Sequence, residues 1–554
     1  MSTGESSGKR ELDWRDGLFA AGLSLGYLCA LLATVKDLGY ARDEGFYFQA
    51  AKSYEAWWSL LLEHAHTALE PAIVDRYWSA NHEHPSFMKA LFGLSHHYLW
   101  QAHHLFAEQG TAYRFPGMVV SASALATTYL WGRQAVGRLA GLVAALALAC
   151  MPQVFYHSHL ACFDMPVSAL LLLTSYAYFR SLDSSIGWAL ATGVLYGILL
   201  DTKHNSWLLP AAFLAHFLVS EGSRLARGLR AGHLAIPSAF YAMLTISPLV
   251  FYASWPWIWH DTARRLAEYA AFHLGHEYYN MEFLGHTYWK PPMPRLYAWL
   301  MTLATVPAIT LLLFALGLGD SARHLREERC ARKKELRPRD PRLSNDALWL
   351  FCMLLCYAPW LSPSTPIFGG TKHWLTAYPF LCLFAGRGFQ LVARKLSELS
   401  RSVAWQGRAA PGLLAGAVVI GPALMTAHSH PWGLSFYAPL VGGVPGAASL
   451  GLNRSFWGYT TGAVQGSINR LAAPSSSVFV HDTALQSWDM LHDDGRVRGD
   501  LHGTLSIPGS SVALYHQEQH MQRVEYQIWT DYGSDAPAEL AAYDGVPIVW
   551  LYRR

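Results

Sequence analysis

Two neighbouring acidic residues, Asp43 and Glu44, follow the first apolar segment of the chain and are its strongest candidates for chemistry. The same polar region continues to the run His82-Glu83-His84-Pro85 and to Lys89. A fixed carboxylate can take a proton from an attacking hydroxyl, while cations stabilise a departing anion. This combination predicts a transfer reaction whose donor is an anionic lipid.

Three further ionisable clusters stand at the ends of apolar segments: Asp164, the pair Lys203-His204, and the pair Lys372-His373. Ionisable residues are costly near a membrane and are candidates for function by default. Any one of them alone is more often a helix cap or a snorkelling side chain. We expect function because the topology derived below places all of these clusters on one face.

The composition indicates an integral membrane protein. Apolar residues make up 52% of the 554 residues, and charged residues make up only 15%, against about 25% in an average soluble domain. The apolar residues gather into segments long enough to cross a bilayer as helices. We predict eleven spans, at 17–37, 115–132, 139–157, 165–181, 185–201, 205–220, 233–254, 296–318, 346–362, 373–392 and 410–427.

Basic residues predict the orientation, because short cytoplasmic loops retain Lys and Arg. With a cytoplasmic N-terminus, every inner loop is basic, and the first span is a signal anchor. The inner basic residues are Lys9, Arg10, Arg15 and those within Arg133–Arg138, Arg180, Arg224–Arg230, Arg323–Arg342 and Arg387–Arg408. A solvated inner loop near anionic lipid explains the run at 323–334 better than a nucleic-acid patch does. We therefore expect the bilayer, and no nucleic acid, as a partner.

Three outer regions remain, at 38–114, 255–295 and 428–554. The first contains stretches suited to helices that lie in the membrane interface. The last turns β-rich, with strand-like runs at 477–481, 511–515 and 547–552 and helical runs at 483–492 and 518–529. We predict a transmembrane domain at 1–427, a connecting segment at 428–473, and a small α/β domain at 474–554 outside the membrane.

The motifs resemble glycosyltransferase family 39, the protein O-mannosyltransferases and lipid A aminoarabinose transferases with the GT-C membrane fold. The resemblance covers about residues 15–390 and lies in the order and spacing of the motifs. They are Asp43-Glu44, His82-Glu83-His84-Pro85 with Lys89, Tyr113-Arg114-Phe115-Pro116, Asp164-Met165-Pro166, Thr202-Lys203-His204-Asn205 and Gly370-Thr371-Lys372-His373-Trp374.

This resemblance implies an inverting transfer of a hexose or pentose from a polyprenyl-phosphate donor. Asp43 would be the catalytic base, Glu44 would support it, and Asp164 would orient the acceptor. The substrate-binding residues would be Glu83, His84, Lys89, Arg114, Lys203, His204, Lys372 and His373, with Lys89, Arg114, Lys203 and Lys372 on the phosphate. His84-Pro85-Ser86 departs from many relatives, although a protonated His84 would still bind phosphate.

Several alternatives stay open. A lipid or ion transporter uses similar residues, although its charges usually lie near the bilayer midplane between repeated halves, and neither feature is seen. A glycan ligase with a diphosphate-linked donor shares the membrane chemistry. Relatives need no obligatory metal, but His82, His84, His260, His273, His276 and His286 leave a divalent ion open without matching a zinc spacing. The acceptor is not identified by the sequence.

Overall fold

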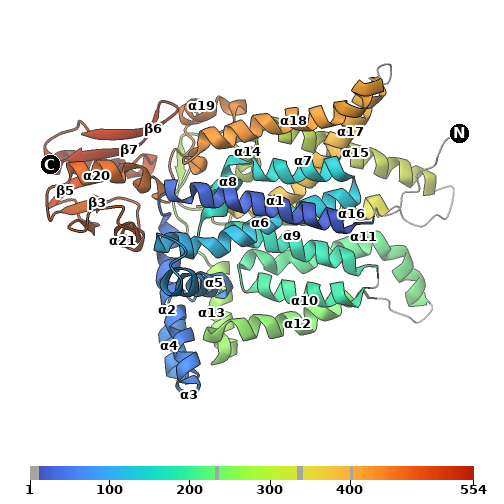
Figure 1. Cartoon of the computed structure of the whole chain (residues 1–554), viewed down its shortest axis with the longest axis horizontal. Coiled ribbons are helices and arrows are strands. Elements are labelled where there is room, and N and C mark those ends of the chain that lie inside the picture. The colour runs from blue at the N-terminus through green and yellow to red at the C-terminus, as the bar shows by residue number, and fades with distance from the viewer. Residues whose placement is uncertain (1–10, 184, 231–235, 333–340, 400–403) are drawn as a thin grey trace.

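The computed structural model describes residues 11–183, 185–230, 236–332, 341–399 and 404–554. It is mostly helical, with a bundle of long helices and a small sheet domain at one end (Figure 1). Helix α1 runs along the bundle, and its first turn lies at the end away from the sheet. We call the end of the bundle that meets the sheet domain the outer end.

In its described residues, each of the eleven predicted apolar segments is mainly helical. Two of them are broken into two helices, α7 with α8 and α14 with α15. The helices are α1 (Trp14–Thr34), α6 (Gln109–Ala135), α7 (Arg138–Ala149), α8 (Pro152–His159), α9 (Asp164–Ser181), α10 (Ile186–Leu200), α11 (Leu209–Arg230), α12 (Ser238–Ser254), α14 (Tyr297–Thr305), α15 (Ala308–Arg332), α16 (Pro341–Tyr357), α17 (Tyr378–Leu399) and α18 (Ala404–Ser429).

Three helices in the described residues are long and apolar enough to cross a membrane, at Trp14–Asp37, Ala308–Glu328 and Ala409–Ser429. A fourth crossing results if α7 and α8, which meet at 68°, form one broken span. Pro152 opens α8, where its missing N–H breaks the continuous hydrogen-bond ladder that a straight helix through 139–157 needs. The number of eleven crossings stays a prediction.

Part of the basic pattern that predicts the orientation lies outside the described residues. This applies to Lys9 and Arg10 and to the side chains at 224–230, 329–343 and 400–408. Among the described inner residues, Arg133 and Arg138 both pair with Asp16 at 3.1 Å and so join α1 to α6 and α7.

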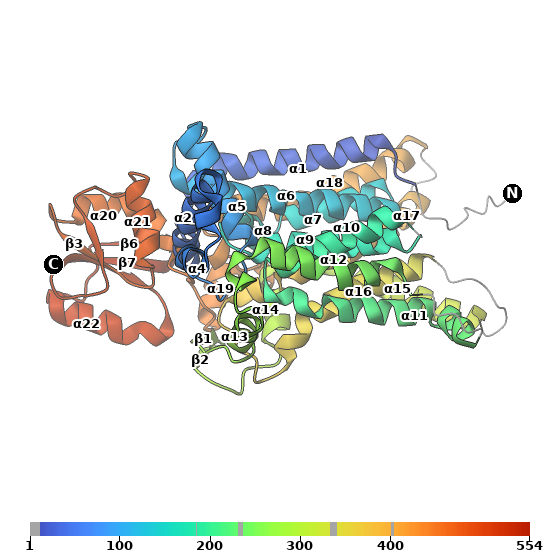
Figure 2. The same ribbon diagram turned by 90° about the horizontal axis from the view of Figure 1, so that it is seen from below.

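Further helices lie across the outer end of the bundle, in Figures 1 and 2. They are α2 (Arg42–Glu63), α3 (Ala65–Ala68), α4 (Pro71–Trp78), α5 (Phe87–Ser95) and α13 (Thr262–Leu274). The predicted interfacial helices at 54–62 and 87–106 correspond to the end of α2 and to α5 with the π-helix His96–Ala102. A hairpin of β1 (Met281–Phe283) and β2 (His286–Tyr288), which was not predicted, follows α13.

The tail forms a five-stranded sheet in the order β4-β3-β5-β7-β6. The three predicted strands are β3 (Ser477–Val480), β5 (Ser510–His516) and β7 (Val546–Arg553); β4 (His502–Thr504) and β6 (Glu539–Tyr543) were not predicted. Helices α20 (Gln465–Leu471) and α21 (Leu485–Asp493) lie on one side and α22 (Gln522–Tyr532) on the other (Figure 2).

Alternation of side chains joins this sheet to the bundle. Successive residues of a strand point to opposite faces. Val478 and Val480 share a buried cluster with Leu38 and Tyr40 near the start of α2, whereas Phe479 packs with Ile528 of α22. The sheet domain is therefore held against the outer end by a continuous apolar core.

Candidate functional site

A cavity of about 590 Å³ lies where the outer end of the bundle meets the sheet domain. Side chains from α2, the start of α9, the turns around 203 and 372, the loop 272–282 and the connecting segment line it. Eight of the eleven predicted site residues are in its wall: Asp43, Glu83, His84, Asp164, Lys203, His204, Lys372 and His373. Residues spread over more than half of the chain thus meet in one place.

Asp43 stands in the first turn of α2 and pairs with Lys372. The Asp43 Oδ2 to Lys372 Nζ distance is 3.3 Å. The Asp43 side chain is 28% exposed, whereas that of Lys372 is 6% exposed. Asp43 is therefore a partly exposed carboxylate held beside a buried cation.

Asp164 is the first residue of α9 and makes the second ion pair. Its Oδ1 lies 2.6 Å from Lys203 Nζ. Burial alone would raise the pKa of the Asp164 carboxyl, but the ammonium groups of Lys203 and Lys372 outweigh it and hold that pKa below its usual value. An ammonium has three donors, so Lys203 can hold Asp164 and still bind an anion in the cavity.

Histidines form another part of the wall. The ring of His204 stacks on that of His273 at 4.0 Å, and the ring of His84 is 5.6 Å from His273. Burial lowers the pKa of His84 and of His204 well below the ordinary value, so both are neutral near pH 7. A neutral His84 can still donate one hydrogen bond from its ring, but it brings no positive charge to a phosphate.

His373 and Glu83 line the cavity with side chains that are already partly engaged. The backbone N–H of Gly369 donates to His373 Nε2 at 2.9 Å, which fixes the turn that carries Lys372. Glu83 Oε1 accepts from Asn81 Nδ2 at 2.7 Å. Both residues therefore shape the wall as well as face it.

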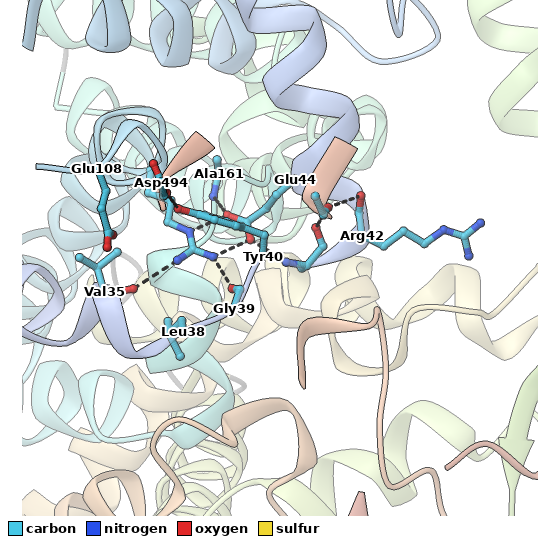
Figure 3. A network of polar contacts seen from close by, with 12 residues as sticks. Val35, Leu38, Gly39, Tyr40, Arg42, Glu44, Glu108, Ala161 and Asp494 are labelled. Atoms are coloured by element: carbon cyan, nitrogen blue, oxygen red, sulfur yellow. Dashed lines mark hydrogen bonds and ion pairs between the residues drawn. The ribbon is translucent and has the colours of Figure 1, made fainter. Parts of the chain in front are cut away.

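Glu44 and Arg114 form a separate, fully buried pair, and Figure 3 shows Glu44 among its neighbours Gly39, Tyr40 and Ala161. Arg114 donates to both carboxylate oxygens of Glu44, at 2.8 and 2.7 Å, and to the carbonyl of Gly39 at 2.6 Å. Glu44 also accepts from the backbone N–H groups of Ala41 and Ala161, each at 2.9 Å. The pair lies outside the cavity lining, so Arg114 does not take the phosphate-binding place expected of it, while Glu44 stays the neighbour of Asp43 in α2.

Lys89 differs from its expected placement in the same way. It is buried in α5, outside the cavity lining, and donates to the carbonyls of Asn81 at 2.5 Å and His84 at 2.8 Å. Burial lowers its pKa to about 7. Lys89 therefore holds the turn at 81–84 in place and does not face the cavity.

The part of the cavity wall that comes from the connecting segment and the sheet domain was not predicted from the sequence. Its aromatic and polar residues include Asn453, Ser455, Phe456 and Trp457, and its acidic residues are Asp482 and Glu518. Burial raises the pKa of Glu518, and nearby Asp482 adds to the effect. The run Phe456-Trp457-Gly458-Tyr459 was a visible signal, but its distance along the chain from Asp43 concealed the contact.

The histidines of the outer regions are the candidate ligands for a metal ion. Within the described ranges, no group of three or more His, Cys, Asp or Glu side chains is arranged to hold a metal ion. His84, His273 and His276 line the cavity, whereas His260 and His286 lie outside its lining.

Comparisons with known proteins bear on residues 94–252. This segment matches the family model described as dolichyl-phosphate-mannose-protein mannosyltransferase. The resemblance predicted from the motifs is therefore confirmed for the segment that carries Arg114, Asp164, Lys203 and His204. A search of curated proteins gives no match.

Solved structures similar to this chain include ArnT from Cupriavidus metallidurans bound to undecaprenyl phosphate. It is 15% identical, with a TM-score of 0.48, over 96% of this chain and 97% of that one. The oligosaccharyltransferase AglB from Archaeoglobus fulgidus, in complex with an inhibitory peptide and a dolichol-phosphate, is 10% identical, with a TM-score of 0.48, over 94% of this chain and 72% of that one.

Proposed function

We propose that the protein is a multi-pass membrane glycosyltransferase of the GT-C fold. It moves a sugar from a polyprenyl-phosphate donor to a hydroxyl or phosphate acceptor on a protein, lipid or glycan. The observation that carries the proposal is the meeting of a reachable carboxylate, Asp43, with two ion-paired lysines, Lys372 and Lys203, in one cavity at the outer end. The family match of residues 94–252 supports the reaction class.

In the proposed mechanism Asp43 accepts the proton of the acceptor hydroxyl, and the resulting oxygen attacks the anomeric carbon. The bond from that carbon to the phosphate oxygen breaks, and the lipid phosphate leaves with the electron pair. Lys203, oriented by Asp164, stabilises the developing charge. A single displacement inverts the configuration. Lys372 holds Asp43 in position.

Residues outside the cavity wall support this arrangement. The Glu44–Arg114 pair fixes the start of α2 against α6 and against the backbone of Ala161. Lys89 fixes the turn that carries Glu83 and His84. We assign these three residues to positioning and leave the phosphate to Lys203 and Lys372. No obligatory metal enters the mechanism.

The orientation is part of the proposal. The cavity and the sheet domain lie at the same end of the bundle. The basic loops support a location of that end on the outer face of the plasma (inner) membrane, with the N-terminus in the cytoplasm. A donor of this kind presents its sugar at that face while its tail stays in the bilayer.

The test is incubation of the purified protein in detergent with radiolabelled polyprenyl-phosphate sugars, following label that leaves the lipid. Release of sugar from the monophosphate donor supports the proposal. Release only from a diphosphate-linked glycan favours the ligase. Movement of intact lipid across proteoliposomes without release of label favours a transporter and contradicts the proposal.

A further inference from the structure

The segment Asn453–Trp457 enters the cavity from the connecting segment and is rigidly held there. Ser435 Oγ donates to the carbonyl of Arg454 at 2.6 Å, and the hydroxyl of Tyr437 donates to the carbonyl of Asn453 at 2.8 Å. At its other end the backbone N–H of Arg42 donates to the carbonyl of Trp457 at 2.8 Å. The segment is thus attached to the first residue of α2, next to Asp43.

Two polar atoms of this segment are buried without a partner. Ser455 is 2% exposed, and its Oγ has no hydrogen-bond partner among the residues that the structure describes; the same holds for Oδ1 of Asn453. Both residues line the cavity. Buried polar side chains are almost always hydrogen-bonded, so a group left over in a cavity wall points to a ligand.

The neighbouring aromatic residues, Phe456 and Trp457, pack against each other beside Lys372. The rings of Phe456 and Trp457 stack at 4.8 Å, and the Trp457 ring lies 3.9 Å from Lys372 Nζ. Trp457 has a φ of +68°, a left-handed conformation that is strained for a bulky residue. Strain of this kind gathers at functional sites, where the surrounding structure enforces it.

We propose that Asn453, Ser455 and Phe456 form a subsite for a hydroxylated sugar ring beside Asp43. The hydroxyl of Ser455 and the amide of Asn453 bond to sugar hydroxyls, and the apolar face of the ring packs on Phe456. Trp457 places the segment against both Asp43 and Lys372. The inference rests on the proposed function and adds to it the element that recognises a sugar.

The same chemistry fits the sugar of the donor and a sugar on the acceptor, and the experiment separates the two. Ser455→Ala and Asn453→Ala are compared with the parent and with Ser449→Ala, a matched control whose exposed hydroxyl bonds to Pro445 of its own helix. Binding is measured with tritiated polyprenyl-phosphate mannose and with sugar-free polyprenyl phosphate. Transfer of the labelled sugar away from the lipid is measured in a separate assay.

If the subsite takes the donor sugar, both variants bind the sugar-bearing lipid at least about fivefold more weakly, while the control and the binding of sugar-free lipid stay unchanged. Unchanged donor binding with transfer slowed by a similar factor assigns the subsite to the acceptor. Unchanged binding and unchanged transfer in both variants overturn the proposal.

This design keeps the two proposals apart. If the parent protein releases no sugar but binds the sugar-bearing lipid more tightly than Ser455→Ala does, the transfer reaction is refuted and the subsite is supported. Equal binding of sugar-free lipid by parent and variants shows that the variants are folded.

Discussion

Lys372 and Asp43 are 329 residues apart in the chain, and their charged atoms lie 3.3 Å apart. The lysine is enclosed by the rings of Phe368, Phe456 and Trp457, the nearest at 3.9 Å. Asp43 is therefore the more accessible member of the pair, and Lys372 holds it from the buried side. This relation supports the base role that we propose for Asp43.

We expect Asp43→Asn to lower sugar transfer by at least about a hundredfold, the usual contribution of a general base. An amide of the same shape cannot accept the proton, but it leaves the cavity intact. Label leaving the donor lipid measures the loss, with Asp261→Asn at an exposed position as the control. Activity equal to that of the parent would remove Asp43 from the mechanism.

Lys203→Ala is expected to weaken donor binding by roughly 10- to 150-fold, because a hydrogen bond to a charged group contributes about 1.5–3 kcal/mol. Lys203→Arg should keep part of the affinity. Binding of polyprenyl phosphate in detergent measures the effect, and Lys52→Ala is the control on the exposed surface. Unaltered affinity in Lys203→Ala contradicts a phosphate role.

Arg114→Met should destabilise the protein by about 3–5 kcal/mol, because it leaves the Glu44 carboxylate buried without its partner. The double variant Glu44→Leu with Arg114→Met should recover part of that loss. Thermal unfolding in detergent, with donor binding of the folded fraction, checks both variants. Normal stability combined with lost phosphate binding would return Arg114 to the role expected from the motif.

The sequence predicted which charged residues are functional candidates better than it predicted which way their side chains point. We selected Asp43, Asp164, Lys203 and Lys372 from the sequence because they stand at the ends of apolar segments. An ionisable group is costly there and is therefore a candidate for function. Arg114 lies in the same kind of position, but a motif does not show which face of α6 carries the side chain. That face turns toward Glu44 and away from the cavity.

The helices were predictable because apolar length is a local property, whereas their breaks and packing are not. Edge strands β4 and β6 are short or partly exposed and lack a strong apolar pattern. Ser455 and Trp457 reach the cavity only through long-range contacts with Tyr437 and Arg42. Such contacts have no signature in a single sequence.

The sheet domain should lose stability as the pH falls below about 6.5. Burial lowers the pKa of His481 from 6.5 to about 3, and the backbone N–H of His516 donates to its Nδ1. Between pH 6.5 and about 3 the unfolded chain binds a proton that the folded domain excludes, so stability decreases toward acid.

His481→Asn keeps an acceptor without a titrating ring and should flatten this dependence. Melting temperatures between pH 4.5 and 7.5 provide the measurement, in detergent for the full chain. A variant with the same pH slope as the parent would exclude His481 as the source.

The orientation predicts that Ser534→Cys, exposed near the C-terminus, reacts with a membrane-impermeant thiol reagent in intact cells. Ser185→Cys, in the short connection between α9 and α10, should react only after permeabilisation. The reverse pattern would invert the topology and place the cavity on the cytoplasmic face.

The fully buried Glu44–Arg114 pair has one more consequence for its neighbour. Successive helical residues point about 100° apart, so two adjacent carboxylates of the first turn of α2 meet different surroundings. Glu44, bound to Arg114 and to the backbone of Ala161, holds α2 in one rotation against the bundle, and in that rotation Asp43 lines the cavity. The direction of the proposed base therefore depends on a residue that lies outside the cavity lining.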